Sequence, residues 1–251
     1  MQGQVGLVLG LANEHSIAYG CARALRDSGA QLAVTYRNAR AEAYARPLAK
    51  SLGCALAMPC DVERPGELES VFDAIGRTWG RLDFAVHCIG AAPRADLRGR
   101  VADCSREGFL RAMDVSVHSF IRLARLAAPL MDRGGCLLTL SYIGAEEAVP
   151  QYNVMGPVKA ALESAARYLA AELGPKGIRV HPISSGPVPT RAGSGLSGFD
   201  ELLAAAAAKA PLRRLVTIDD IGALAAFLAS DAARSITGCT VYVDAGYHIM
   251  G

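Results

Sequence analysis

Hydrophobic and polar positions along this chain fall into two alternating kinds of segment. Short, almost wholly apolar runs are each followed by a longer segment in which apolar residues recur at every third or fourth position. The short runs are typical of strands covered on both faces of a sheet, and the longer segments are typical of amphipathic helices. The predicted strands are residues 5–9, 31–36, 55–60, 82–88, 136–140, 178–183 and 240–243.

Helical patterns separate these strands. The predicted helices are residues 16–29, 39–52, 65–79, a long helix capped by Ser105, 157–173 and 217–229. Because strands and helices alternate along the whole chain, the pattern predicts an α/β, Rossmann-like, doubly wound fold, with a seven-stranded parallel sheet and helices on both faces. Ligands of such sheets bind beyond the carboxyl ends of the strands.

No internal repeat or linker divides the chain, so residues 1–251 are predicted to form a single domain. One stretch stands out near the end: residues 186–198 contain four glycines and two prolines, and the alanine run 204–208 follows. Glycine and proline disfavour regular structure, whereas alanine favours a helix. We therefore expect a mobile loop that continues into a helical lid, over residues 186–209.

Composition supports a folded enzyme-sized domain and narrows its class. Apolar residues make up 51% of the chain and charged residues 20%, which argues against disorder. The net charge of +2 is too small to indicate binding to nucleic acid or to an anionic membrane. No apolar run approaches the roughly 18 residues of a membrane span, and the start resembles no signal peptide. A cytoplasmic protein is expected.

The seven cysteines are odd in number and form no C-x-x-C pair or Cys/His cluster. They therefore predict neither a disulfide framework nor a zinc site, and no metal is expected. The histidines likewise form no H-E-x-x-H or triad arrangement, and His87 ends an apolar run, which favours a buried structural role.

Residues 141–159 carry the most distinctive candidate chemistry. Tyr142 and Tyr152 provide two phenols, and Lys159 provides an ammonium group. Tyr152 and Lys159 are seven residues apart, which is two turns of a helix, so the spacing predicts side chains that point the same way. A phenol and a cation together suit a reductase, which must stabilise the negative charge that hydride transfer creates. Pro157 modifies this expectation: it predicts that regular helix begins close to it, with Tyr152 just ahead of the helix or in a distorted first turn.

The turn after the first predicted strand favours binding of phosphate. Gly10 permits a tight turn, Gly20 permits close packing of helix on strand, and Ser16 stands at a predicted helix N-terminus. The stretch is not G-x-G-x-x-G, so the signal is weak by itself. No Walker lysine follows, which excludes a nucleoside-triphosphate loop.

The segment after the second predicted strand bears on the choice of dinucleotide. Many dinucleotide folds place an acid here, but this chain has Arg37 and Arg40. Arginines at this point could pair with a 2′-phosphate, which favours NADPH. Stacking of Arg37 on adenine, or simple solvation, explains the sequence equally well. The choice between NADH and NADPH stays open.

Together these motifs resemble the enoyl-acyl-carrier-protein reductases, a divergent branch of the short-chain dehydrogenase/reductase family. The resemblance covers nearly the whole chain. The residues that carry it are Ser16-Ile17-Ala18, Asp61-Val62, His87-Cys88-Ile89-Gly90, Ser141-Tyr142, Tyr152, Lys159, Gly186-Pro187-Val188-Pro189-Thr190 and Asp244-Ala245-Gly246. Ordinary short-chain dehydrogenases space their tyrosine and lysine by four residues. A spacing of seven moves the phenol by roughly 4.5 Å, toward the more distant oxygen of an enoyl thioester.

The resemblance implies NAD(P)H-dependent reduction of the trans-2 double bond of enoyl thioesters in fatty acid biosynthesis. The implied catalytic residues are Tyr152, Lys159 and Tyr142. Cofactor contacts are implied for Gly10, Ser16, Ile17, Arg37, Asp61, Val62, Ile89, Gly90, Lys159, Val188 and Thr190. Substrate contacts are implied for Ala92, Tyr142 and Tyr152. Ala91 stands where many members have an aromatic residue, so the acyl pocket could differ in shape.

The resemblance also implies partners, and it leaves alternatives. The substrate would be bound to acyl carrier protein or coenzyme A. A homotetramer is expected, with residues 105–131 and 157–173 as packing helices. A reductase of the same fold could act instead on another carbonyl or alkene. A sensor that binds the cofactor without turnover is a third possibility, which the presence of both Tyr152 and Lys159 disfavours.

Overall fold

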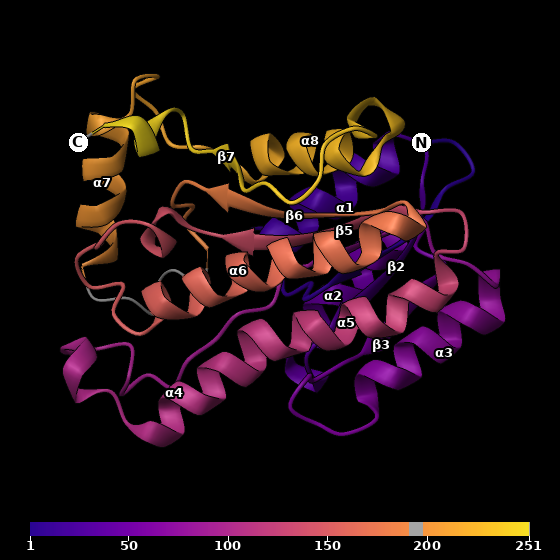
Figure 1. Ribbon diagram of the computed structural model, residues 1–251, viewed down its shortest axis with the longest axis horizontal. Helices are drawn as coiled ribbons and strands as arrows, with labels where there is room; N and C mark the ends of the chain where they lie inside the picture. The colour runs from indigo at the N-terminus through magenta and orange to yellow at the C-terminus, as the bar shows by residue number, and fades with distance from the viewer. Residues whose placement is uncertain (191–197, 251) are drawn as a thin grey trace.

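The computed structural model describes residues 1–190 and 198–250. A seven-stranded parallel sheet in the order β3-β2-β1-β4-β5-β6-β7 forms its centre (Figure 1). The strands are β1 Val5–Leu9, β2 Gln31–Tyr36, β3 Leu56–Pro59, β4 Phe84–His87, β5 Gly135–Ser141, β6 Ile178–Ser185 and β7 Val241–Val243. The order runs outward from β1 in both directions, which is the doubly wound topology. The predicted fold class is therefore confirmed.

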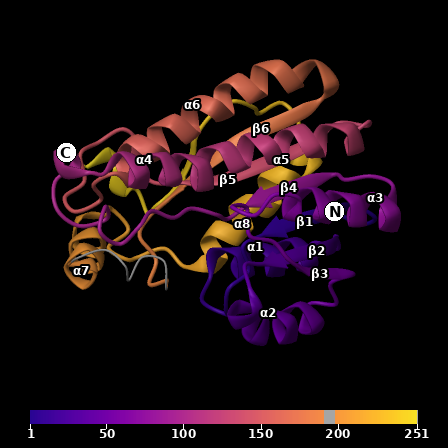
Figure 2. The same cartoon turned by 90° about the horizontal axis from the view of Figure 1, so that it is seen from below.

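Helices cover both faces of the sheet. They are α1 Ile17–Asp27, α2 Ala39–Ser51, α3 Glu67–Trp79, α4 Arg106–Met113, α5 Ser119–Ala127, α6 Met155–Leu173, α7 Phe199–Lys209 and α8 Ile218–Ala229. Figure 2 shows α3, α4, α5 and α6 on one side of the strands and α1, α2 and α8 on the other. The seventh helix, α7, belongs to neither layer and lies beyond the carboxyl ends of the strands (Figure 1).

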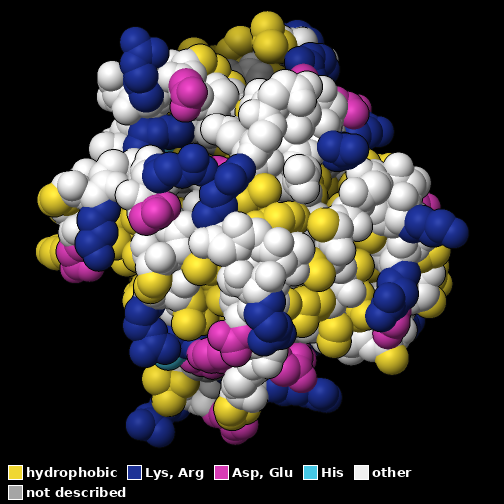
Figure 3. Space-filling view, turned by 90° about the vertical axis from the view of Figure 1, so that its right-hand side faces the viewer, with side chains coloured by type: hydrophobic (Ala, Val, Ile, Leu, Met, Phe, Trp, Pro, Cys, Tyr) yellow, Lys and Arg dark blue, Asp and Glu magenta, His cyan; other side chains and the backbone are white. Residues whose placement is uncertain are grey.

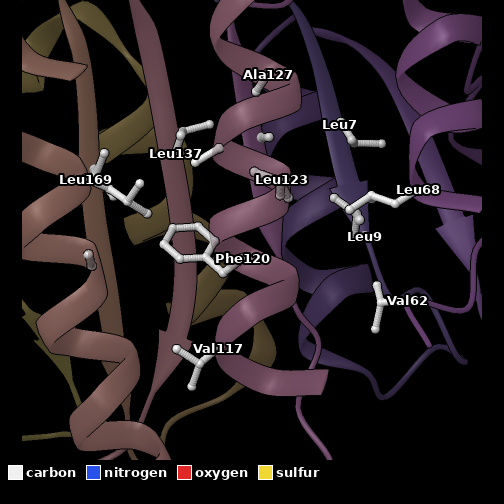
Figure 4. Close-up of a cluster of buried hydrophobic side chains, with 14 of the residues drawn as sticks. Leu7, Leu9, Val62, Leu68, Val117, Phe120, Leu123, Ala127, Leu137 and Leu169 are labelled. Atoms are coloured by element: carbon white, nitrogen blue, oxygen red, sulfur yellow. The ribbon is translucent and has the colours of Figure 1, made fainter. Parts of the chain in front are cut away.

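Two hydrophobic clusters, one on each face, hold these layers together. In the first, Phe120 and Leu123 of α5 pack between Leu137 of β5 and Leu7 of β1, and all four are fully buried (Figure 4). The second cluster joins α1, α2 and α8 to the opposite face. Strands β1 to β6 contribute side chains to both clusters, so their apolar residues do not simply alternate with polar ones.

Two glycines bring α1 and α8 into close contact. A Cβ added to Gly20 would lie 2.2 Å from the Ile218 carbonyl oxygen, and one added to Gly222 would lie 2.4 Å from the Gly20 carbonyl oxygen. Backbone therefore meets backbone where the helices cross. This contact positions the N-terminus of α1, which faces the carboxyl ends of the strands.

The predicted helix after Ser105 is interrupted. Ser105 caps it as expected, since its hydroxyl oxygen accepts a 2.9 Å hydrogen bond from the Gly108 amide. Between α4 and α5, however, residues Asp114–His118 form a π-helical segment. An apolar period of three to four residues does not distinguish the two helix types, so the interruption was not predictable from spacing.

Charged side chains are dispersed at the end of the molecule that carries the amino ends of the strands. Figure 3 shows Lys and Arg interspersed with Asp and Glu around apolar surface on this face. None of the helices within the described ranges has the length and apolar composition that a membrane span requires.

Candidate active site

A cavity of about 620 Å³ opens at the carboxyl ends of the strands. It collects side chains from the turns after β1, β2, β4, β5 and β6 and from α7. Of the predicted site residues, its lining includes Gly10, Ser16, Ile17, Arg37, Ile89, Gly90, Ala92, Tyr142, Tyr152, Lys159, Val188 and Thr190. Asp61 and Val62 do not line it: Val62 is buried in the core, and Asp61 lies behind Arg37.

Tyr152 lies in a turn ahead of α6, as Pro157 predicted. The helix begins at Met155, which places Pro157 in its first turn, where a missing N–H is tolerated. The interpretation that Tyr152 and Lys159 lie on one helical face is therefore wrong. Both neighbours of Tyr152 have left-handed backbone, with φ 65° at Gln151 and 48° at Asn153. Such strained pairs cluster at functional sites, and here they aim Tyr152 into the cavity.

The two tyrosine rings pack against each other. The centroids of the Tyr142 and Tyr152 rings are 4.8 Å apart, and the planes meet at 65°. Gly144 makes room for them, since a Cβ there would lie 2.4 Å from the Tyr152 ring. Burial raises the pKa of both phenols above the ordinary value. Each hydroxyl therefore keeps its proton at neutral pH and is available as a hydrogen-bond donor.

Lys159 enters the same cavity from α6. Its ammonium group is buried and donates a 2.6 Å hydrogen bond to the Leu140 carbonyl oxygen. Burial lowers the pKa of Lys159 to about 8, although the nearby Glu163 carboxylate partly opposes the shift. An ammonium group has three donors, so hydrogen bonds remain for a ligand.

Glu163 lies one helical turn beyond Lys159 and is buried. Its carboxylate accepts hydrogen bonds from the hydroxyls of Ser141 and, at 3.1 Å, Thr240. Burial raises the pKa of Glu163 against the effect of these hydrogen bonds. Sequence patterns do not single out this residue, because a Glu in a helix is usually exposed.

The turn after β1 requires glycine at its start and leads into the N-terminus of α1. Gly10 has φ 93°, and a Cβ there would lie 2.6 Å from the Cys88 carbonyl oxygen, so only glycine fits. Ser16 is the N-cap of α1, but its hydroxyl donates to the Asn13 carbonyl oxygen at 2.6 Å. The first amides of α1 have no helical acceptors, and such a helix N-terminus favours a phosphate.

Gly90 lies between the catalytic candidates and the core. A Cβ on Gly90 would lie 3.5 Å from the Lys159 ammonium nitrogen and 3.7 Å from the Ser116 hydroxyl. Ser116 comes from the π-helical segment, is fully buried, and accepts a 3.2 Å hydrogen bond from the Ala91 amide. The π segment thus fixes the backbone after β4 beside Lys159. Spacing gave no signal for this contact.

Arg37, at the end of β2, is held by carboxylates. Its Nε donates to Asp61 at 3.0 Å, and its Nη2 donates to Glu63 at 2.8 Å. Arg111 of α4 also binds Glu63, at 2.6 and 3.0 Å. Glu63 and Arg111 were not predicted, since they are 48 residues apart and neither belongs to a motif.

The predicted loop 186–209 is described in part, because residues 191–197 lie outside the described ranges. Pro187 and Val188 line the cavity at its start, and Phe199 and Leu202 of α7 line it at its end. The alanine run 204–208 lies within α7, as its helix propensity predicted.

His87 has the structural role expected of it. It is fully buried, and its ring nitrogens lie 3.1 Å from the Thr139 hydroxyl and 2.8 Å from the Ser119 hydroxyl. Burial, followed by the Lys159 charge, lowers the pKa of His87 to about 3. Among the residues that the structure describes, no group of His, Cys, Asp or Glu could hold a metal ion.

These features fit a dinucleotide. The N-terminus of α1 and the Lys159 ammonium suit phosphates and ribose hydroxyls, Gly10 and Gly90 line the cavity without side chains, and the two phenols also line it. The lining includes Arg37, from the turn after β2, as well as Phe199 and Leu202 of α7.

Comparisons with known proteins agree with this geometry. Residues 10–248 match a family model described as enoyl-(acyl carrier protein) reductase. The chain is 47% identical to "Enoyl-[acyl-carrier-protein] reductase [NADH] 2" of Rhizobium meliloti, over 99% of this chain and 93% of that protein. It is also 47% identical to the NADH enzyme of Aquifex aeolicus, over 100% and 93%.

Solved structures are similar as well. The crystal structure of the Aquifex aeolicus enzyme superposes with a TM-score of 0.97 and covers 100% of this chain and 98% of that one. The Bacillus cereus reductase, solved with NADP⁺ and an indole naphthyridinone, gives 0.97 at 45% identity and the same coverage. The Anaplasma phagocytophilum reductase, solved with NAD, gives 0.96 at 46% identity, covering 100% of this chain and 96% of that one.

Proposed function

The chain belongs to the enoyl-(acyl carrier protein) reductase family, and from this premise we propose that Tyr152, Lys159 and Tyr142 perform its chemistry. The protein is an oxidoreductase that reduces the double bond of enoyl thioesters in fatty acid biosynthesis with a nicotinamide cofactor. The observation that carries the residue roles is the convergence of Tyr152 and Lys159, from a turn and a helix, on one cavity.

Tyr152 acts on the thioester end of the substrate. The bound cofactor supplies the hydride, and negative charge develops on the thioester carbonyl oxygen. The Tyr152 hydroxyl, protonated because burial raises its pKa, donates a hydrogen bond to that oxygen and stabilises the enolate. Tyr142, with its ring against Tyr152, limits the movement of that ring and lines the substrate space together with Ala92.

Lys159 acts on the cofactor. Its hydrogen bond to Leu140 fixes the ammonium group at the edge of the cavity, and its other donors bind the ribose hydroxyls. Gly10, Ser16 and Ile17 bind the pyrophosphate, and Ile89 and Gly90 lie along the ribose. Val188 and Thr190 contact the carboxamide and a phosphate, whereas Arg37, with its partner Asp61 and the adjacent Val62, belongs to the adenosine end.

The substrate is carried by acyl carrier protein, and the corresponding coenzyme A thioester is also accepted. Residues 186–209 form the substrate loop, because α7 contributes Phe199 and Leu202 to the cavity wall. The same proposal includes two expectations from the sequence: the chain forms a single domain, and the protein is cytoplasmic. Four chains assemble into a homotetramer through α4, α5 and α6.

The test is direct turnover. Purified protein is mixed with crotonyl-acyl carrier protein and each reduced cofactor, and the loss of reduced nicotinamide absorbance is followed. Tyr152→Phe should lower kcat by about 10²-fold or more while the Kd for cofactor stays within about twofold, since one transition-state donor is removed. Equal losses in both quantities, or no loss in either, would contradict the role given to Tyr152.

A further inference from the structure

The ion-pair cluster at the end of β2 carries information about which cofactor the site accepts. It joins Arg37, Asp61, Glu63 and Arg111. We propose that Glu63 is a specificity-determining residue, which makes this reductase select NADH over NADPH. This inference rests on the proposed function only in taking the Arg37 end of the cavity as the adenosine site.

The charge of Arg37 is already paired with two carboxylates. Two of its donors, Nε and Nη2, already bind the carboxylates of Asp61 and Glu63 at 3.0 and 2.8 Å. The arginine that alone would favour a 2′-phosphate is therefore neutralised by its neighbours. A phosphate would have to compete with two carboxylates for it.

Glu63 is fixed in this position from two sides. Both oxygens of its carboxylate accept hydrogen bonds from Arg111, at 2.6 and 3.0 Å, in a bidentate pair that restricts rotation. Its backbone amide donates to the Asp61 carboxylate at 3.2 Å, which fixes the turn between them. The carboxylate thus remains beside Arg37 without depending on the ligand.

The charges of the cluster favour a hydroxyl over a phosphate. Two guanidinium groups face two carboxylates, so the cluster has no net charge. A phosphate monoester has a charge of about −1.5 to −2 at neutral pH, and to pair with Arg37 it would have to displace the Asp61 and Glu63 carboxylates that already neutralise this arginine. A ribose 2′-hydroxyl is uncharged and needs no free cation beside it. NADH therefore fits the cluster, and NADPH is disfavoured.

The test measures binding without turnover. Isothermal titration of the full chain gives Kd values for NADH and NADPH, and for the fragments 5′-AMP and 2′,5′-ADP, which differ by the 2′-phosphate. Wild type should bind NADH and 5′-AMP more tightly. Glu63→Gln should lower the ratio Kd(NADPH)/Kd(NADH) by about fivefold, the effect of one exposed ion pair.

Two further variants identify the cause. In an Arg37→Gln background, Glu63→Gln should leave the ratio Kd(NADPH)/Kd(NADH) unchanged. The reason is that Arg37, which Glu63→Gln would free for the 2′-phosphate, is no longer present. The matched control is Glu69→Gln, which removes the same charge from a carboxylate that binds Arg122 at 3.0 and 3.1 Å. Glu69 is not paired with Arg37, the arginine that lines the cavity, so the ratio of the Glu69→Gln variant should equal the wild-type ratio.

Any one of three results would overturn the inference. The wild type could bind NADPH more tightly than NADH, or Glu63→Gln could change the Kd ratio no more than Glu69→Gln does. The third is that Glu63→Gln lowers the Kd ratio equally in the Arg37→Gln background. Failure of the proposed function would look different. Nucleotides would then bind with the expected ratio, but no enoyl thioester would be reduced. Absence of binding by either nucleotide would reject the cofactor site and this inference together.

Discussion

Tyr152 depends on one glycine for its position. Its ring fills the space that a Gly144 side chain would occupy, with a Cβ at 2.4 Å from the ring and 3.3 Å from the Tyr142 ring. Gly144→Ala must therefore displace the phenol. Since a displacement of about 1 Å can lower a rate by about 10²-fold, kcat should fall by about 10- to 100-fold while the Kd for cofactor changes little.

The control for Gly144 is Gly174, which follows α6. A Cβ at Gly174 meets nothing within 4 Å, and its backbone has φ −54°, so alanine fits there. Gly174→Ala should retain wild-type kcat. If Gly144→Ala also retained it, with both variants folded by circular dichroism, the phenol would not need its observed position.

The buried Lys159 ammonium should make stability depend on pH. Its pKa in the folded protein is about 8, below the ordinary 10.5, because burial disfavours the charge. Between these values the unfolded chain binds more protons, so stability rises with pH there. Below about pH 8 the penalty is fully present.

Lys159→Met removes this titration. The difference in unfolding free energy between wild type and Lys159→Met should change by about 3 kcal/mol between about pH 7 and pH 10.5, in favour of wild type at high pH. Urea denaturation of the cofactor-free protein at several pH values measures it. A difference that stays constant with pH would show that the ammonium is not desolvated.

At the level of single residues, sequence patterns found the groups that belong to motifs and missed those that act through tertiary contacts. Tyr152 and Lys159 could be selected because their types and spacing suit reduction. Glu63, Arg111 and Ser116 could not, because their partners lie far away in sequence. Arg37 was found, but its two carboxylates were not connected with it, so the cofactor choice stayed open.

The contact of α1 with α8 links a remote helix to the cofactor site. Gly222 lets α8 approach the Gly20 backbone, and a Cβ there would lie 2.4 Å from the Gly20 carbonyl oxygen. Gly222→Ala should separate the helices and lower the unfolding free energy by about 1–3 kcal/mol. Because α1 begins at Ile17 in the cavity wall, the Kd for cofactor should rise severalfold as well.

Gly76 in α3 provides a control for which the unfolding free energy is expected to rise instead of fall. A Cβ there would have only an ordinary contact, at 3.8 Å from Leu130. Alanine at a helix interior position is favoured over glycine, so Gly76→Ala should raise stability by about 0.5–1 kcal/mol and leave the Kd unchanged. Urea denaturation and isothermal titration measure both variants, and stabilisation by Gly222→Ala would contradict the close contact.

The bounds of a helix or strand were predictable from the sequence where a single local property, such as burial of both faces or a proline, determines them. The strand predicted at residues 5–9 agrees with β1 because both faces of that strand are buried. The start of α6 followed from the missing amide of Pro157. The π segment Asp114–His118 was not predictable, because apolar periodicity is the same for both helix types and the contact of Ser116 with the Ala91 amide joins residues 25 apart in sequence.

The whole molecule combines these elements through the order of the strands. Parallel strands leave every carboxyl end at one edge, so five turns far apart in sequence line a single cavity. The opposite edge has dispersed charges (Figure 3). The layer formed by α4, α5 and α6, in contrast, has apolar side chains that the fold leaves outside the core.

Assembly into a tetramer would cover this layer. Phe109, Leu110, Ile121 and Tyr168 are 40%, 50%, 39% and 71% exposed, and they lie on α4, α5 and α6. Exposed apolar groups on neighbouring helices mark a protein interface, and identical chains close most simply around two-fold axes. Light scattering should give wild type a mass about four times the 26.3 kDa of one chain.

Tyr168→Glu should reduce that mass, because it places a charge in the covered interface. Tyr44→Glu is the matched control, since Tyr44 is 55% exposed on α2, in the opposite helix layer. The control should keep the wild-type mass. A monomeric wild type, or a Tyr168→Glu variant that stays tetrameric at micromolar concentration, would mean that the α4, α5 and α6 layer is not the assembly surface.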